Sequence, residues 1–190
     1  MKTKVFTILA CLIILPFAFV DIAEAQLGMS PTNAVPIGQS INTQVECGAR
    51  AGSMEPYDAK ISVLEVVRGK EAWERIKAAS ASNQPPAAGF EYILARIAFE
   101  MKAFLKPGDK SFELARTKQF VVLSADGNEQ DPPSVTPPKP ELHRMVRADE
   151  PAEGWIVLSV EQANSKPVMF FDPAAGGAMG GGKILFFQLY

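Results

Sequence analysis

The chain has 190 residues, and its 21 acidic and 19 basic side chains leave a formal net charge of −2 at pH 7. The mixed, near-neutral charge argues against nucleic acids and anionic membranes as partners, and the length suits one domain with a substantial core. The chain has a single histidine and two cysteines, too few for a His/Cys zinc cluster. One of the two cysteines lies inside the N-terminal apolar run, so an internal disulfide is impossible once that run has been removed.

The N-terminus has the composition of a secretory signal peptide. Lys2 and Lys4 precede an apolar run over residues 5–20, and Ala23-Glu24-Ala25 offers a small-x-small cleavage site. The apolar run is short for a membrane anchor, and no later segment is long and apolar enough to span a bilayer. We therefore expect residues 1–25 to be removed and the remaining chain to be secreted, with no stable membrane span after cleavage of the leader.

Two other fates of the leader stay open. The apolar run could be retained as an N-terminal anchor helix. The segment Ile8-Leu9-Ala10-Cys11 loosely resembles a lipoprotein processing site, but cutting there would leave residues 12–20 as an exposed apolar tail behind the lipid. The sequence favours cleavage after Ala25 over both.

The elements that follow the leader are weakly marked. Residues 26–34 are interpreted as a flexible tail, and the folded domain is expected to occupy residues 35–190. Residues 35–43 predict a first strand, and residues 44–58 predict a loop or an edge strand around Val45.

The clearest pattern begins at Ala59. Residues 59–67 place Ile61, Val63 and Val67 on one face of a period-two pattern, which predicts a half-buried strand. Residues 70–80 then change period, with apolar residues at three- and four-residue steps, and predict a short helix.

A second strand follows this helical insert. Asn83-Gln84-Pro85-Pro86 ends the helix, because proline lacks the backbone donor and disfavours helical geometry in the residue before it. Residues 90–101 alternate again and predict a strand with one buried face, made of Ile93, Ala95, Ile97 and Phe99.

The second half of the chain predicts further short strands. The turn signal Lys106-Pro107-Gly108-Asp109 separates two apolar runs. The segment Asp131–Pro140 is too rich in proline for a helix or a central strand, and we interpret it as a long crossover between two sheets. Strands are expected at residues 112–114, 119–124, 141–147, 154–160, 168–171 and 183–190, with a glycine-rich hairpin loop at residues 176–182.

Part of this pattern resembles a known family. The run VLEVVRG with the following Ala and Trp, and then Asn, two prolines and the run EYIL, is similar to secreted bacterial immunoglobulin-like domains of unknown function. These belong to the telokin-like superfamily, which also contains a mycobacterial immunoprotective extracellular antigen. The matching residues are Val63, Val66, Val67, Arg68, Gly69, Ala72, Trp73, Asn83, Pro85, Pro86, Gly89, Glu91, Tyr92, Ile93 and Leu94.

The resemblance extends more loosely over residues 35–190. Residues 35–39 look like the family's first strand, and Gly154-Trp155 with the strand that follows looks like a later one. The resemblance implies an all-β fold, an immunoglobulin-like antiparallel β-sandwich with a short helical insert, and a bacterial, extracytoplasmic location. It implies no catalytic motif.

The glycine-rich segment Gly177–Lys183 has the glycine and lysine spacing of a phosphate-binding loop. The next residue should be Ser or Thr to hold magnesium, and it is Ile184. A strand pattern also follows where such a loop must open a helix. We therefore interpret the segment as a hairpin loop.

The acidic turn formed by Asp126, Asn128, Glu129 and Asp131 has the oxygen donors of a calcium site. An EF-hand loop starting at Asp126 would need Gly at its sixth position and Glu at its twelfth, where the chain has Asp131 and Pro137. The main interpretation is a solvated turn, and a looser calcium site between loops stays open.

The remaining reactive side chains are scattered. A Ser-His-Asp triad would have to use His143, but the sequence has no Gly-x-Ser-x-Gly nucleophile elbow, and His143 is expected on the surface. Cys47 is expected to be a buried small hydrophobe, with a free thiol or a bridge between chains as alternatives. Asp149, Glu150 and Glu153 are neighbours in sequence and are expected to face solvent.

Aromatic residues are the best hint of an interaction surface. Trp73 and Trp155 are expected to fill the core. In each of the pairs Phe170-Phe171 and Phe186-Phe187, one ring must point away from the core, because neighbouring side chains of a strand face opposite sides.

The sequence therefore predicts no catalytic residue, no cofactor and no metal. We expect a non-catalytic extracellular binding or interaction module whose partner is an unknown extracellular protein or cell-envelope component. The alternative is a sandwich domain that binds a small ligand or calcium between its loops, and an enzyme is the least favoured class.

Overall fold

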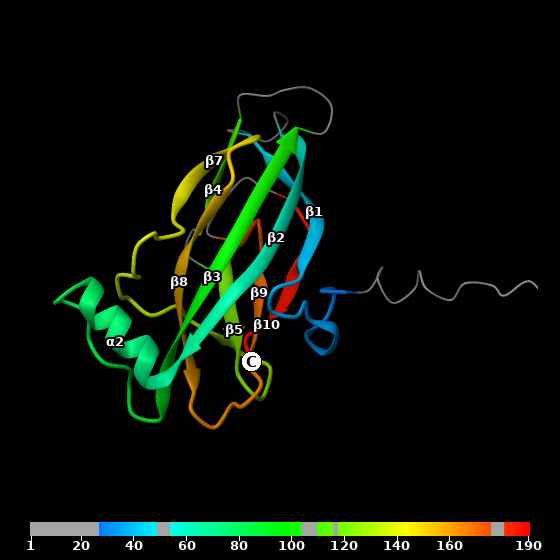
Figure 1. Cartoon of the computed structure of the whole chain (residues 1–190). Coiled ribbons are helices and arrows are strands. Elements are labelled where there is room, and N and C mark those ends of the chain that lie inside the picture. Colours follow the sequence, from blue (N-terminus) through cyan, green and yellow to red (C-terminus); the bar gives the residue numbers. More distant parts are fainter. Residues whose placement is uncertain (1–26, 49–53, 104–109, 116–117, 176–180) are drawn as a thin grey trace, which may run out of the picture.

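A computed structural model describes residues 27–48, 54–103, 110–115, 118–175 and 181–190 (Figure 1). The predictions for residues 1–25, for the turn at 106–109 and for most of the glycine-rich loop lie outside these ranges. The strands are β1 (Ser40–Cys47), β2 (Glu55–Arg68), β3 (Phe90–Ala103), β4 (Ser111–Leu114), β5 (Phe120–Leu123), β6 (Glu129–Gln130), β7 (Arg144–Arg147), β8 (Ala152–Glu161), β9 (Val168–Phe171) and β10 (Leu185–Gln188); the helices are the 3-10 turn η1 (Pro31–Asn33) and α2 (Gly69–Ala79).

The strands form two main antiparallel sheets. One has the order β1-β2-β3-β8 and the other has the order β10-β9-β5-β6. Strands β4 and β7 form a separate antiparallel pair. The all-β prediction is thus confirmed, and the helix lies to one side of the first sheet (Figure 1).

The main core lies between the two four-stranded sheets. Strand β3 contributes Ile93, Ala95, Ile97 and Phe99, all fully buried, which confirms the face predicted from their alternation. The second sheet contributes the inward rings of β9 and β10 and the apolar side chains of β5. Period-two alternation is enough to place these residues because β3 has no irregularity over this stretch.

Strand β2 departs from simple alternation. Its register with β3 shifts after Val63, where Leu64 is inserted as a bulge and is 37% exposed. Beyond the bulge, Val66 packs toward the main core and Val67 packs under the helix. The prediction that Val67 shares a face with Ile61 and Val63 is wrong, because one extra residue shifts the two faces of a strand by one position.

Helix α2 confirms the predicted insert at residues 70–80 to within one residue. It packs on the outer face of β2, β3 and β8, where Ala72 and Ile76 are fully buried. The Arg75 guanidinium lies 5.7 Å from the centre of the Trp155 ring. The side chains between α2 and the sheet form a second core, separate from the main core. It is made of Val67, Ala72, Ile76, Tyr92, Leu94 and Trp155, with Trp73, Val135 and Val157 packed against it.

A buried asparagine joins the helix to the proline-rich segment. The Asn83 Nδ2 donates to the carbonyls of Ile76 (2.7 Å) and Thr136 (2.9 Å), and its Oδ1 accepts from the Thr136 N–H (2.8 Å). Asn83 therefore satisfies backbone groups at the end of α2 and in the crossover at the same time.

The proline-rich segment 131–140 has no helix or strand and connects β6 of the second sheet to β7 and β8, which confirms the predicted crossover. Its end is fixed to β8, since the Trp155 N–H donates to the Pro140 carbonyl (2.8 Å) and the Leu142 N–H donates to the Trp155 carbonyl (3.2 Å). A Cβ on Gly154 would lie 2.6 Å from the carbonyl carbon of Glu141, so only glycine permits this close approach.

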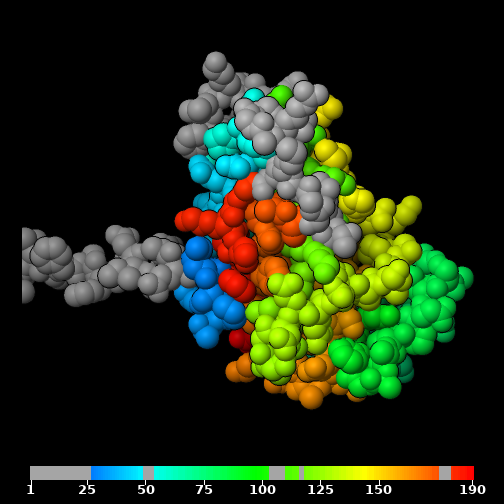
Figure 2. All heavy atoms as spheres, turned by 180° about the vertical axis from the view of Figure 1, so that it is seen from behind, coloured from blue at the N-terminus to red at the C-terminus, as the bar shows by residue number. Residues whose placement is uncertain are grey.

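The stretch predicted as a flexible tail instead lies along β10. The Phe186 N–H donates to the Gly28 carbonyl (2.8 Å), and the Val35 N–H donates to the Phe186 carbonyl (2.8 Å). Leu27 packs against the main core. Figure 2 shows the first described residues in contact with the red C-terminal strand. Tertiary hydrogen bonds and the packing of Leu27 and Ala34 hold this stretch in place, neither of which its composition reveals.

The first strand also differs from its prediction. It begins at Ser40 rather than Val35, because Gly38 turns the chain at a φ of +83°. It runs on to Cys47 at the edge of its sheet, which confirms the alternative of an edge strand around Val45, and β2 begins at Glu55. In the described part of the chain, no helix is long and apolar enough to cross a membrane.

Candidate functional site

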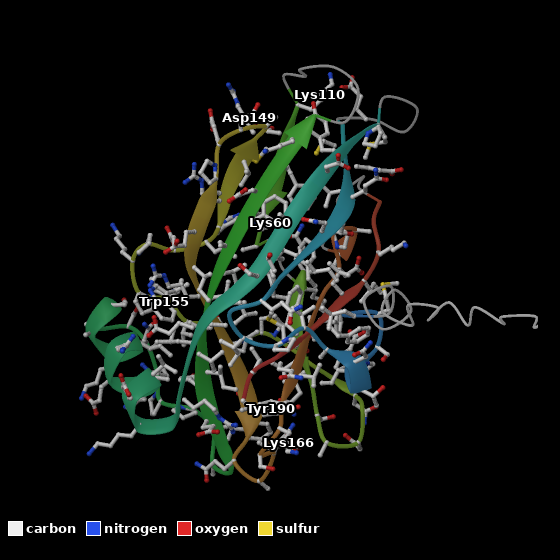
Figure 3. The ribbon with its side chains drawn as sticks, turned by 45° about the vertical axis from the view of Figure 1, so that its right-hand side comes forward. Lys60, Lys110, Asp149, Trp155, Lys166 and Tyr190 are labelled. Carbon is white, nitrogen blue, oxygen red and sulfur yellow. The ribbon has the colours of Figure 1, made fainter. Side chains whose placement is uncertain are left out.

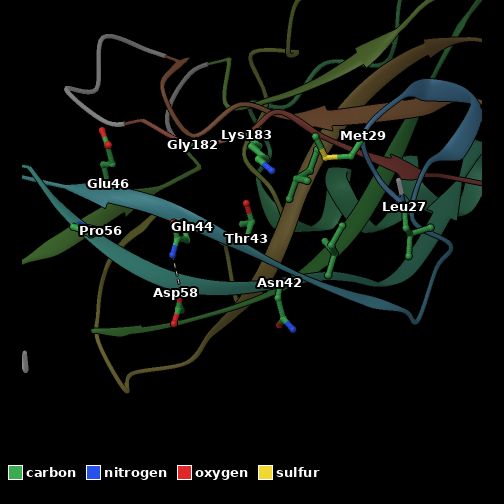
Figure 4. Close-up of a pocket in the computed structure, with 12 residues that line it drawn as sticks. Leu27, Met29, Asn42, Thr43, Gln44, Glu46, Pro56, Asp58, Gly182 and Lys183 are labelled. Atoms are coloured by element: carbon green, nitrogen blue, oxygen red, sulfur yellow. Dashed lines mark hydrogen bonds between the residues drawn. The ribbon is translucent and has the colours of Figure 1, made fainter. Parts of the chain in front are cut away.

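A groove of about 590 Å³ lies along the outer edge of β1 (Figure 4). One wall is β1 with the start of β2, and the other comes from the segment before η1 and from the residues that lead into β10. The lining residues are Leu27, Met29, Ile41, Asn42, Thr43, Gln44, Glu46, Pro56, Asp58, Gly182, Lys183 and Leu185. Its volume is within the range of about 300–1,000 Å³ that is common for ligand sites.

The groove exists because β1 and the C-terminal segment separate. At one end they touch: Val45 pairs with Gly182, and the Glu46 N–H donates to the Gly181 carbonyl (3.0 Å). A Cβ on Gly182 would lie 2.8 Å from the Gln44 carbonyl oxygen, so glycine is needed for this contact. The chain then turns away from β1 as β10 joins β9, which leaves the space open.

The groove combines apolar and charged surface. Met29 is 42% exposed at its rim, and Ile41 and Leu27 pack on the main core beneath it. Lys183 is exposed in the wall opposite β1. On the other side the Gln44 Nε2 donates to the Asp58 carboxylate (3.2 Å). Such a surface can hold an apolar ligand with a few polar groups, and it offers no evident acid–base pair.

A second cavity of about 430 Å³ lies under the proline-rich crossover, beside the edge of β8. Trp155, Phe120 and Pro133 contribute apolar surface, and His143 is at its rim. The His143 ring is exposed, and its Nε2 is 3.4 Å from a Glu113 carboxylate oxygen. The predicted surface position of His143 is confirmed.

The acidic turn satisfies its own carboxylate. The Asn128 Nδ2 donates to Asp126 (2.6 Å), and the Ser124 hydroxyl also donates to Asp126. These hydrogen bonds, led by the one from Ser124, hold the pKa of Asp126 below its usual value. Asp131 instead pairs with Lys118 at 3.1 Å. Among the described residues, no group of three or more His, Cys, Asp or Glu side chains is arranged to hold a metal.

The three neighbouring carboxylates do not converge. Glu153 forms an ion pair with Arg96 across β8 and β3. Asp149 lies at one end of the molecule, far from Lys166 and Tyr190 at the opposite end (Figure 3), and its N–H donates to the Met101 carbonyl (2.9 Å). Their exposure confirms the prediction that they face solvent.

The described end of the glycine-rich segment belongs to the groove. Gly182 and Lys183 line it, and a strand rather than a helix follows, as expected from the aromatic run after Ile184. The outward rings of the two aromatic pairs are Phe170 and Phe186, which face each other across β9 and β10 with ring centres 6.2 Å apart.

Cys47 is 2% exposed, and its Sγ is 4.0 Å from the Met101 sulfur. This confirms the buried position and leaves no exposed thiol at this position for a bridge between chains. Burial, with a smaller contribution from Glu55, raises the pKa of the thiol from 9.0 to about 12.

The raised pKa predicts a loss of stability at high pH. The unfolded thiol ionises above about pH 9, whereas the folded thiol stays protonated to about pH 12, so the free energy of unfolding falls across this window. We expect the parent chain to lose about 2 kcal/mol more than Cys47→Ala between pH 7 and about pH 10.5, measured by urea unfolding. An equal loss in both proteins would contradict this prediction, because the other titrating groups are common to both.

Sequence reasoning missed the groove. Its lining comes from four segments of the chain, and only their packing brings Leu27, Asn42 and Lys183 into one groove. A usable signal was present in Ser40–Gln44, a strand-forming run without charge, proline or glycine.

No family model matches the sequence, and no curated protein matches it. Among solved structures, the chain is similar to a "putative lipoprotein (ycdA)" from Bacillus subtilis subsp. subtilis str. 168, with 14% sequence identity and a TM-score of 0.46. The match covers 68% of this chain and 35% of that one, so the chain spans about a third of the length of that protein.

Proposed function

We propose that this chain is a non-catalytic, secreted interaction module with an immunoglobulin-like fold, and that its partner is an extracellular protein or a cell-envelope component. The observation that carries the proposal is the groove beside β1, where an uncovered strand edge lies next to exposed Met29 and partly buried Leu27 and Ile41. Exposed apolar surface beside polar groups is typical of sites that bind other molecules.

The connections between the sheets support the immunoglobulin-like part of the proposal. The chain crosses from the first sheet to the second between β3 and β5, returns before β8, and crosses again to reach β9. Val35 pairs in parallel with the C-terminal strand at Phe187. Repeated crossing of this kind is typical of Greek-key sandwiches.

Several of the residues that carry the family resemblance pack together around the helix. Val67, Ala72, Tyr92 and Leu94 belong to the second core. Glu91 accepts a hydrogen bond from the Arg68 Nε (3.0 Å), and the Arg68 Nη2 also donates to the Asn164 carbonyl (2.9 Å). The relationship is supported because part of the matching pattern builds the packing of the helical insert on the sheet. The N-terminal leader pattern supports export.

The proposal is tested by site-specific photo-crosslinking in the cell that produces the protein. We expect a crosslinker at Thr43, inside the groove, to give a discrete adduct with a partner, and the same crosslinker at Glu129, on β6 of the second sheet, to give none. If neither position gives an adduct, or if both positions give the same adducts, the groove is not the binding surface.

A further inference from the structure

The two four-stranded sheets differ in how their edges are protected. The β10 edge is covered by the segment from Gly28 to Val35. The β8 edge is covered by residues 140–142, and prolines of the crossover line the cavity beside the rest of it. Strand β6 has only two residues and carries Glu129. In the part of the chain that the structure describes, β1 is the long edge without such protection.

The open part of β1 has backbone groups that point away from the sheet. The Glu46 N–H bonds outward to Gly181, and the β1–β2 register is regular from Ser40 to Cys47. Because backbone groups alternate along a strand, the N–H and C=O of Asn42 also point outward. Among described residues, no backbone hydrogen bond from Ser40 to Thr43 is made on this side.

The side chains of this edge allow another strand to approach. Natural edge strands are commonly protected by charges, prolines or bulges. The run Ser40–Gln44 has none of these, and its exposed side chains are uncharged. The inward side chain of Ile41, with Leu27 and Leu185 across the groove, forms an apolar floor, and Lys183 is the charged group in the opposite wall.

We propose that an extended segment of a partner protein adds to β1 as a further strand, with apolar side chains at alternate positions and one carboxylate facing Lys183. This inference rests on the proposed function and specifies its ligand class. Backbone hydrogen bonds to Asn42 provide affinity, and the groove selects the alternate side chains. The Lys183 ammonium favours an acidic residue at the inward position.

The shape of the groove favours a peptide over a second copy of this chain. The edge is recessed between Met29 at one end and Gly182 at the other, which both line the hollow (Figure 4). A single extended segment can enter such a hollow. In a second copy of the chain, β1 is flanked by the walls of its own groove, and these would have to fit into the hollow as well.

A pair of substitutions at Asn42 tests the backbone contact. Asn42→Pro removes the outward N–H at an edge position, where proline is tolerated, and Asn42→Ala removes only the side chain. The probe is a display library of short unstructured peptides, selected on the secreted chain. We expect enriched peptides with alternating apolar residues, bound equally by Asn42→Ala and at least about tenfold more weakly by Asn42→Pro.

A second measurement leaves the protein unchanged, in case Asn42→Pro fails to fold. Two versions of the selected peptide are compared, one N-methylated at its odd-numbered residues and one at its even-numbered residues. One version should lose binding and the other should keep it, because only one of the two sets of N–H groups faces β1. Lys183→Glu should weaken the same peptide at least about tenfold and select peptides with a basic residue instead.

Three results would overturn the inference. They are a library that yields no binder, binding that is equal in the two Asn42 variants and insensitive to N-methylation, and a dimer on a sizing column that Asn42→Pro converts to a monomer. The last result would make a second copy the occupant. Crosslinking at Thr43 without dependence on the backbone of Asn42 would leave the proposed function standing and remove strand addition alone.

Discussion

Phe171→Ala is expected to destabilise the protein by about 3–5 kcal/mol. The Phe171 ring is fully buried between the sheets, with ring centres 5.0 Å from Phe120, 6.4 Å from Phe99 and 6.5 Å from Phe112. The substitution removes the contacts that the Phe171 ring makes with these three rings and leaves a cavity between the two sheets. Because domains of this size are stable by about 5–15 kcal/mol, the loss is a large part of the total.

The measurement is urea unfolding followed by tryptophan fluorescence at low temperature. The matched control is Phe186→Ala, which removes the half-buried ring on the outer face of β10. We expect this control to cost less than half as much. Equal costs, or a larger cost for Phe186, would contradict the assignment of Phe171 to the core and of Phe186 to the outer face.

Asn83→Ala is expected to destabilise the protein by about 2–4 kcal/mol. The substitution removes three hydrogen bonds at once and leaves the Ile76 carbonyl and the Thr136 backbone without their partner. Asn83 is 8% exposed, so water reaches these groups poorly. The cost comes mainly from the unsatisfied backbone groups rather than from lost apolar contact.

Two measurements check this expectation. Urea unfolding gives the loss of stability, and limited proteolysis reports whether the crossover at residues 131–140 becomes accessible while the rest stays folded. Gln84→Ala is the control, because Gln84 is exposed and its amide donates only to the Ser82 carbonyl (3.2 Å). If Asn83→Ala costs no more than the control, the asparagine does not connect the helix to the crossover.

The fold class and most strand positions were predictable from the sequence. Alternation in residues 90–101 identifies the buried face of β3, because a regular strand presents every second side chain to the same side. The period change after Arg68 identifies α2, and the proline density of residues 131–140 excludes regular structure there. These are local properties, which the chain expresses wherever it is placed.

Other features depend on contacts between distant segments, and no local pattern contains them. The bulge at Leu64 reverses the faces of β2, and the segment from Gly28 to Val35 is held by its hydrogen bonds to β10 and by the buried side chain of Val35. The groove is of this kind, since Asn42 and Lys183 line one hollow only after the two sheets have packed. The sequence alone determined the position of the helix and of most strands, because these follow from local patterns of side chains. Tertiary structure alone decided which strand edge stays uncovered, because that depends on where the rest of the chain has run.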